Sequence, residues 1–226
     1  MNIISFMLVA ILSCCCVFSI SYKKDDPLII EEALPVTDYD GNEYRTVRIG
    51  NQIWMAENLK TTHYSDGTPV QNYIYNNEET NVSKYGRLYR WAAAMRNAAS
   101  SNSNPSGIQG VSPDGWHVPS SAEWIELINN LGGSTVAGGK LKSIGTTDWL
   151  EPNTSATNGS LLNVLPAGFY RVDGAFMKLN EWSVLISSTT TGIGISVRML
   201  KNNSQGIISE IFHPLDAVSV RCVKNN

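Results

Sequence analysis

Cysteine and histidine are scarce in this chain, which limits the chemistry it can carry. The 226 residues include four cysteines and three histidines. Cys14, Cys15 and Cys16 are consecutive, and no Cys or His pair has the spacing of a zinc site. Cys222 has no histidine near it in the sequence to act as a base, so it is a poor candidate nucleophile. We therefore expect no metal, no cofactor and no enzymatic activity.

Charge is also sparse and nearly balanced. Charged residues make up 16% of the chain, the net charge is -3 and the pI is about 5.6. A nucleic-acid-binding domain normally carries a basic patch, so we expect no nucleic-acid partner. Gly-rich phosphate loops and serine nucleophile elbows are missing as well. The hydrophobic content of 42% suffices for one globular domain and a short leader.

Residues 2–20 form an uncharged apolar stretch whose length suits a signal peptide and is marginal for a membrane span. Residues 11–14, Ile-Leu-Ser-Cys, resemble a lipobox. We predict a lipoprotein-type leader over 1–20, lipidation of Cys14 and a polar tether over 21–36. Acylation of Cys15 or Cys16 stays open, as does an uncleaved anchor helix, because no Lys or Arg precedes the stretch. Each alternative gives an exported domain held at a membrane.

Turn and periodicity signals indicate the elements of the domain. The dipeptide Gly50-Asn51 predicts a hairpin between residues 43–49 and 52–59. Residues 61–86 are polar and read as a long loop, whereas the Ala-rich stretch 85–99 predicts a helix. Ser120 and Glu123 have the spacing of a capping box, and four apolar residues follow on one helical face: Trp124, Leu127, Ile128 and Leu131.

Short β-like runs dominate the second half of the chain. Helices early and strands late favour an α+β fold. The predicted strands are residues 162–166, 169–172, 175–179, 184–188, 193–200, 206–212 and 217–223.

A series of motifs between residues 37 and 224 is similar to the Fibrobacter succinogenes major paralogous domain family. They are Asp40-Gly41-Asn42-Glu43-Tyr44, residues 49–59, 85–89 and 91–95, Pro113-Asp114-Gly115-Trp116-His117-Val118-Pro119, Glu123-Trp124, residues 138–142, Trp149, Pro152-Asn153, residues 156–158 and 165–168, and Ser219-Val220-Arg221-Cys222-Val223. The resemblance assigns residues 37–226 to this domain. It implies a C-type lectin-like variant related to the formylglycine-generating-enzyme group, with about two early helices and an antiparallel, loop-rich sheet. Members are typically surface lipoproteins of Gram-negative bacteria, which implies the outer membrane or cell surface as the location.

Two departures from the family pattern matter. Family members usually carry a cysteine where this chain has Ser112, and the resemblance implies that it pairs with the C-terminal cysteine. Cys222 has therefore lost its expected partner, which removes a cross-link that would contribute ~3–5 kcal/mol. Residues 190–216 match the family poorly and form a second candidate binding face.

Two further sites contain residue types that can carry chemistry. Glu151 and Asn153 flank a proline as in the calcium motif of mannose-type C-type lectins. Calcium needs six or more oxygen ligands, and no second acidic pair follows, so we expect no metal there. His117 has no evident carboxylate partner and is expected to be a buried histidine satisfied by the backbone.

The loop 71–77 is the better candidate for ligand contact, because Tyr and Asn supply contact area and adaptable hydrogen bonds. Tyr73, Tyr75 and Asn76 are the predicted contact residues. The leading hypothesis is a surface lipoprotein whose domain binds a glycan or protein. A structural envelope protein without a diffusible ligand is the alternative, and an enzyme related to the formylglycine-generating group comes third.

Overall fold

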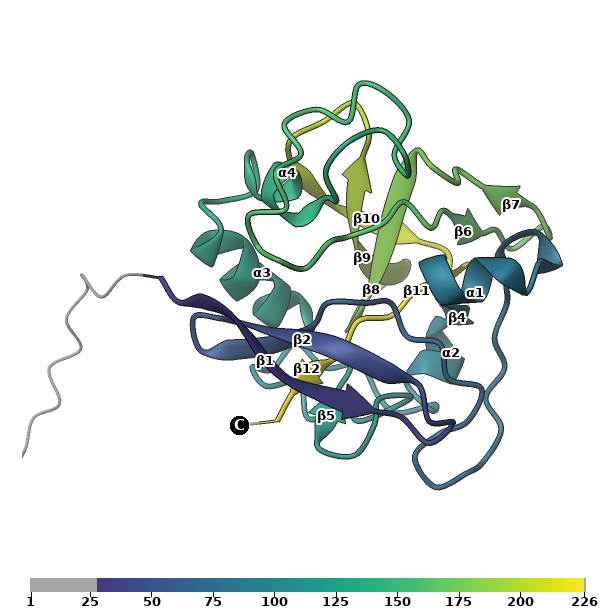
Figure 1. Cartoon of the computed structure of the whole chain (residues 1–226). Coiled ribbons are helices and arrows are strands. Elements are labelled where there is room, and N and C mark those ends of the chain that lie inside the picture. The colour runs from purple at the N-terminus through teal and green to yellow at the C-terminus, as the bar shows by residue number, and fades with distance from the viewer. Residues whose placement is uncertain (1–27, 226) are drawn as a thin grey trace, which may run out of the picture.

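The N-terminal half of the domain contributes most of the first of two sheets. The computed structural model describes residues 28–225 (Figure 1). This sheet is antiparallel, and along it lie β1 (Ile30–Thr37), β2 (Glu43–Ile49), β3 (Gln52–Met55), β12 (Val223–Lys224) and β5 (Trp116–His117). The β2–β3 turn is the predicted one, since Gly50 has the positive φ of 59° that a tight hairpin turn requires.

Strands from the C-terminal half form most of the second sheet. Its order is β10 (Ile207–Phe212), β9 (Gly194–Lys201), β8 (Trp182–Thr191), β11 (Ala217–Ser219), β6 (Phe169–Tyr170) and β7 (Phe176–Met177), and β4 (Leu88–Arg90) also pairs with β11. The chain therefore crosses from one sheet to the other between β11 and β12. Val218, Val220 and Cys222 of this crossing are buried in one core cluster that includes residues of both sheets.

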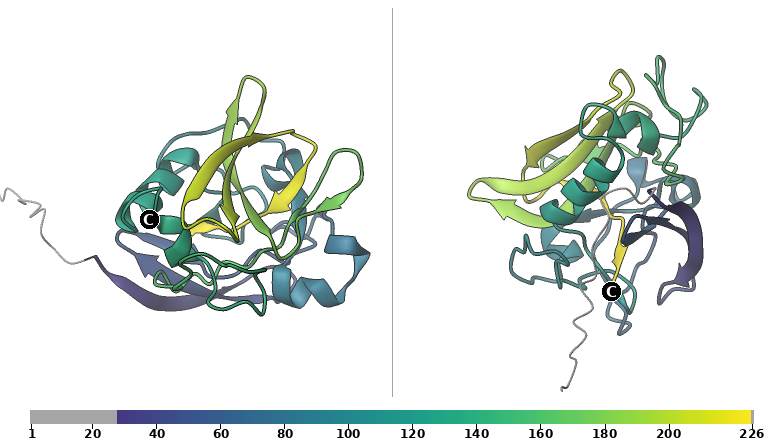
Figure 2. Two further views of the ribbon diagram at one scale, coloured as in Figure 1. Left: turned by 90° about the horizontal axis from the view of Figure 1, so that it is seen from above. Right: turned by 90° about the vertical axis from the view of Figure 1, so that its left-hand side faces the viewer.

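Helix α3 (Ser121–Asn130) forms where the sequence predicts it. The Ser120 hydroxyl accepts from Glu123 N at 3.2 Å, and the Glu123 carboxylate accepts from Ser120 N at 2.9 Å. Its apolar face packs along β8 (Figure 2), where the Trp124 indole donates to Ile186 O at 2.9 Å. Trp124 also contacts Trp54 at 4.5 Å between ring centroids. Burial of each such ring contributes about 1.5–3 kcal/mol.

The remaining helices are short. They are η1 (Tyr75–Asn77), α1 (Thr80–Tyr85), α2 (Trp91–Ala94) and α4 (Ala137–Leu141). The helix predicted over 85–99 is wrong apart from the single turn α2. Residues 88–90 pair with β11 instead, and Arg96 and Asn97 take positive φ values of 52° and 59°, which end the helix.

Three further expectations differ from the structure. Residues 30–36, assigned to the tether, belong to β1, whose mostly exposed side chains and internal Pro35 conceal the strand in the sequence. Residues 162–166 form no strand and reach Lys142 only through a bridge at Val164. The predicted loop 61–86 contains η1 and α1. The mixture of helices and strands is compatible with the predicted α+β class, and strands and loops predominate.

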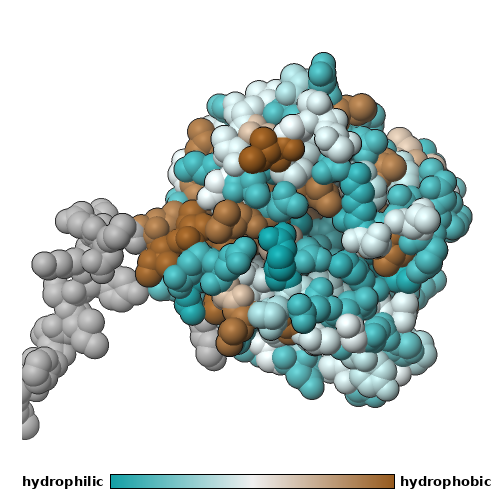
Figure 3. Space-filling view, in the orientation of Figure 1, coloured by the Kyte–Doolittle hydropathy of each residue, from teal (hydrophilic) through white to brown (hydrophobic). Residues whose placement is uncertain are grey.

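Exposed apolar side chains are dispersed over the molecule. Figure 3 shows one concentration where the described chain begins, next to β1. Leu28 and Ile29 are 42% and 51% exposed there. No helix within residues 28–225 is long and apolar enough to cross a membrane.

Candidate functional site

Tyr73 extends the edge of β4. Its backbone exchanges two hydrogen bonds with Leu88, each of 2.8 Å, so the loop runs beside the strand. The Tyr73 ring is stacked on Tyr170 of β6, with centroids 4.4 Å apart and planes 22° apart. A residue 97 positions later in the chain thus holds the ring in place.

Tyr73, Tyr170, Phe176 and Arg90 form what we call the aromatic surface. The Tyr170 and Phe176 rings lie 4.8 Å apart, and all four side chains are partly exposed. Arg90 and Tyr170 both pair with Ala217 from opposite sides of β11. Residues in register across neighbouring strands point to the same face, so the sheet itself brings the guanidinium and the ring together.

Arg90 is a cation whose charge has no carboxylate partner among residues 28–225. Its guanidinium lies 5.2 Å from the Tyr73 ring centroid, and its buried Nε has no hydrogen-bond partner there. A guanidinium beside an aromatic ring is stabilised by the ring quadrupole while its outer N–H groups stay free to donate. The aromatic surface therefore offers ring faces and unused donors side by side.

The three predicted contact residues have different positions. Tyr73 is partly exposed, and Asn76 is exposed with a positive φ of 55°. Tyr75 is only 9% exposed: its ring lies 5.2 Å from Phe176 and its hydroxyl accepts from Leu179 N at 3.3 Å. Tyr75 therefore supports the aromatic surface from below, and little of its own side chain is exposed for ligand contact.

Sequence reasoning missed Tyr170, Phe176 and Arg90. The first two lie on a hairpin whose turn contains Asp173-Gly174, a recognisable turn dipeptide between aromatic residues. That signal could have drawn attention to the pair. No local signal places Arg90 at this surface, because the Ala-rich stretch 85–99 predicts a helix at its position.

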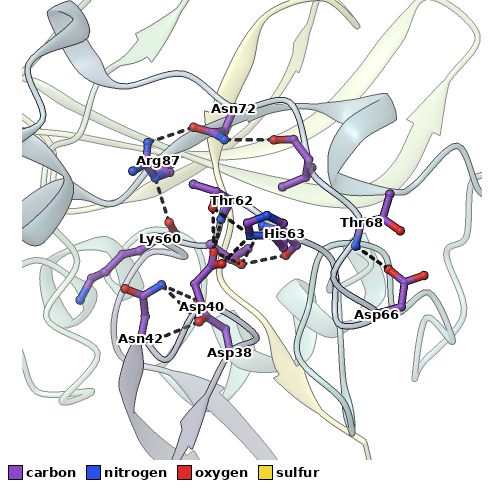
Figure 4. Close-up of polar contacts among 12 residues, drawn as sticks. Asp38, Asp40, Asn42, Lys60, Thr62, His63, Asp66, Thr68, Asn72 and Arg87 are labelled. Atoms are coloured by element: carbon purple, nitrogen blue, oxygen red, sulfur yellow. Dashed lines mark hydrogen bonds and ion pairs between the residues drawn. The ribbon is translucent and has the colours of Figure 1, made fainter.

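A polar network fixes the loop that leads to Tyr73 (Figure 4). The Asp40 carboxylate accepts from Thr62 N at 2.5 Å, from the hydroxyls of Thr61 and Thr62 at 3.0 and 2.9 Å, and faces His63 Nδ1 at 2.5 Å. Burial raises the pKa of Asp40, but these hydrogen bonds outweigh it and lower the pKa to about 2. Asp40 is thus an anion at neutral pH and anchors the loop to the β1–β2 turn.

Arg87 holds the same loop from the other side. Its Nε donates to Lys60 O at 2.9 Å, and its Nη1 donates to Asn72 Oδ1 at 3.1 Å. Its Nη2 forms an ion pair with Glu79 at 2.7 Å. Because Asn72 immediately precedes Tyr73, these bonds fix the backbone that carries the ring.

The Asp40–His63 pair is a structural link as it stands. A catalytic pair of this kind would need a hydroxyl or thiol on the histidine nitrogen remote from the carboxylate. The hydroxyl beside His63 is that of Thr62, which approaches Nδ1, the nitrogen that also faces Asp40. The Asp40–His63 pair therefore holds the loop that leads to Tyr73 in place.

Glu151 and Asn153 do not converge. Glu151 is exposed, whereas Asn153 is buried and its amide nitrogen donates to Ser143 O at 3.0 Å and Gly145 O at 2.6 Å. Within residues 28–225 no group of three or more His, Cys, Asp or Glu side chains could hold a metal ion. The Asn153 amide nitrogen thus closes a loop, while its Oδ1 is buried and has no hydrogen-bond partner within residues 28–225.

His117 has a carboxylate partner, contrary to the sequence-based expectation. Its Nε2 lies 2.5 Å from Glu123 and its Nδ1 lies 2.6 Å from Asn225 Oδ1. The His117 and Glu123 side chains are each only 2% exposed. Glu123 also accepts from Ser106 N at 3.1 Å, so one carboxylate joins β5, the helix cap and a loop. The sequence predicts only the capping contact of Glu123 among these interactions.

The second predicted face, residues 190–216, is mainly a structural hairpin. Ile195 and Val197 are fully buried, while Ile193 at the turn is 86% exposed. Cys222 is a free, fully buried thiol whose pKa burial raises to about 12, which makes it unreactive. Cys14 and the predicted leader lie outside the described residues.

The fold and the surface define a small α+β domain with a preorganised aromatic face on one edge. The family model described as the Fibrobacter succinogenes major domain matches residues 47–224. The chain therefore belongs to this family, which confirms the resemblance drawn from its motifs. No curated protein and no solved structure matches the chain.

Proposed function

We propose that this protein is a non-catalytic binding module that recognises a glycan through its aromatic surface. The observation that supports the proposal is the stack of Tyr73 on Tyr170 beside Arg90, whose charge is uncompensated within residues 28–225. A sugar presents apolar C–H faces to rings and hydroxyl or carboxylate groups to N–H donors. The same face supplies both kinds of contact.

Preorganisation supports binding at this face. The β4–β11–β6 register fixes Arg90 and Tyr170, and the Asp40 and Arg87 networks fix the loop of Tyr73. A ligand that meets fixed side chains loses less of its binding free energy to ordering them. A weakly binding ligand such as a glycan depends on this smaller loss of binding free energy.

We further propose that the domain is a variant of the C-type lectin-like fold, related to the formylglycine-generating group. We also propose that lipidation of Cys14 tethers the protein to the outer membrane or cell surface of a Gram-negative bacterium. The lipobox-like residues 11–14 support the tether. Labelling of cells with a palmitate analogue tests it: the wild-type chain should incorporate label, and Cys14→Ala should not.

A glycan array probed with the full chain tests the binding function. The array should carry neutral and acidic oligosaccharides, and Tyr73→Ala and Arg90→Gln should each weaken binding about tenfold or more. Leu34→Ala is the control, because Leu34 is 85% exposed on β1 and belongs neither to the aromatic surface nor to the networks that fix the Tyr73 loop. Binding to no glycan, or equal binding by all variants, would reject the proposal. Capture of a protein through Tyr73 would replace glycan by protein as the ligand.

A further inference from the structure

Arg221 is a buried cation in the crossing between the two sheets. Its residue is 2% exposed, its Nε donates to Asn58 Oδ1 at 2.9 Å and its Nη1 donates to Leu162 O at 2.6 Å. Both acceptors are neutral, and no carboxylate within residues 28–225 forms an ion pair with it. A guanidinium has five N–H donors, so several remain for another acceptor.

The charge of Arg221 is costly where it lies. Burial lowers its pKa to about 9, and Glu57 offsets the effect only in part. The group is still protonated at neutral pH. Buried charges in proteins are normally paired with an opposite charge, because desolvation without a partner is strongly unfavourable. The Arg221 guanidinium therefore lacks a paired anion within residues 28–225.

A small cavity adjoins Arg221. Its volume is about 30 Å³, and its polar wall consists of Glu57, Asn58, Lys60, Lys84, Asn163 and Arg221. Three of these side chains are cations and one is a carboxylate. The wall is therefore positive, and the space admits one small group rather than a whole sugar or nucleotide.

The one carboxylate in the wall is already engaged. Glu57 accepts from Lys60 Nζ at 2.8 Å and from Arg45 N at 3.2 Å. Burial raises the pKa of Glu57, but these bonds outweigh it and keep the side chain ionised. Lys84 is paired with Asp148 at 2.6 Å, outside the wall. Among the three cations of the wall, Arg221 is therefore the one without a carboxylate partner within residues 28–225.

We propose that this cavity binds a single carboxylate group, with Arg221 as its principal donor and Lys60 and Lys84 at its rim. The carboxylate belongs either to a small free acid or to an acidic sugar. The site is separate from the aromatic surface, and the test of the site does not depend on the function proposed for that surface.

The Nε–H resonance of Arg221 reports on this site directly. It should be followed by ¹⁵N–¹H correlation spectroscopy in the full chain while sodium acetate, sodium formate or sodium glucuronate replaces sodium fluoride at constant ionic strength. Saturable movement of this resonance is expected. A resonance that moves with acetate and formate but not with glucuronate identifies a free acid as the ligand. Tighter binding of glucuronate than of acetate identifies an acidic sugar.

Rim variants provide the control for charge. Lys60→Gln and Lys84→Gln should each weaken acetate binding about 3- to 5-fold, the size of an exposed charge pair. Lys224→Gln, an exposed lysine that does not line this cavity, should leave it unchanged. The proposal is overturned if the Arg221 resonance stays fixed with all three anions, or if all three lysine variants weaken binding equally.

Discussion

The hydroxyl of Ser112 lies beside the thiol of Cys222 in the interior, and both residues are fully buried. The two groups are neighbours without a hydrogen bond of good geometry, since the Ser112 oxygen has no partner within residues 28–225. These are the two positions that the family resemblance pairs as cysteines. The fold therefore places side by side the two positions at which the resemblance implies a cross-link.

Ser112→Cys should restore a disulfide to Cys222. A cross-link that closes so long a loop is expected to raise the free energy of unfolding by roughly 3–5 kcal/mol, and it also removes an unpaired buried hydroxyl. Urea unfolding of the oxidised and reduced variant measures the gain. Equal stability in the two redox states would contradict the prediction, and Ser112→Ala controls for the loss of the hydroxyl.

Asp40→Asn should loosen the loop that leads to Tyr73 and remove a pH-dependent contribution to stability. The folded pKa of about 2 lies below the ordinary value of 3.8, so the contribution is present above pH 4 and is lost as the pH falls toward 2. For a side chain that is 21% exposed we expect about 1–2 kcal/mol at pH 7. Thermal unfolding between pH 2 and pH 7 measures it.

The control for Asp40 is Glu210→Gln, an exposed carboxylate on β10. Its unfolding curve should keep the wild-type dependence on pH. If Asp40→Asn and Glu210→Gln had the same pH profile, the anchoring role of Asp40 would be disproved.

Glu123→Ala should be severely destabilising. It removes the acceptor for Ser106 N and Ser120 N and leaves His117 without its carboxylate, all in a buried site. We expect a loss of about 3–5 kcal/mol, against about 1 kcal/mol for Ser120→Ala, which removes only the cap. Chemical denaturation compares the two, and similar losses would show that the buried network contributes little.

Tyr75→Ala and Tyr73→Ala should separate stability from binding. Tyr75 is buried against Phe176, so its truncation should cost about 3 kcal/mol or more of unfolding free energy. Tyr73 is partly exposed, so its loss should cost less stability and mainly affect ligand contact. Melting temperatures of both variants provide the measurement, and a larger loss for Tyr73 would reverse the assignment.

Local signals predicted the elements that local contacts determine. Helix α3 was recognisable because its cap and its apolar face lie within residues 120–131, and the β2–β3 hairpin because Gly50 supplies its turn. The stretch 85–99 misled because pairing with β11, more than 120 residues away, overrides the helical preference of alanine.

The candidate site was predictable only in part, for the same reason. Tyr73 and Asn76 could be picked from the composition of their loop, but the burial of Tyr75 depends on Phe176, and the partner of Tyr73 is Tyr170. Glu123, the carboxylate beside His117, is only six residues away in the sequence, but its spacing from Ser120 predicts a capping role instead. Contacts between distant segments decide which side chains of a loop are exposed.

The decisive measurement is the glycan affinity of the wild-type chain compared with those of Tyr73→Ala, Arg90→Gln and the control Leu34→Ala. We expect saturable binding of at least one array glycan by the wild type and by Leu34→Ala, with about tenfold weaker binding by the other two variants at unchanged fold. Wild-type affinity in Tyr73→Ala and Arg90→Gln would contradict this expectation.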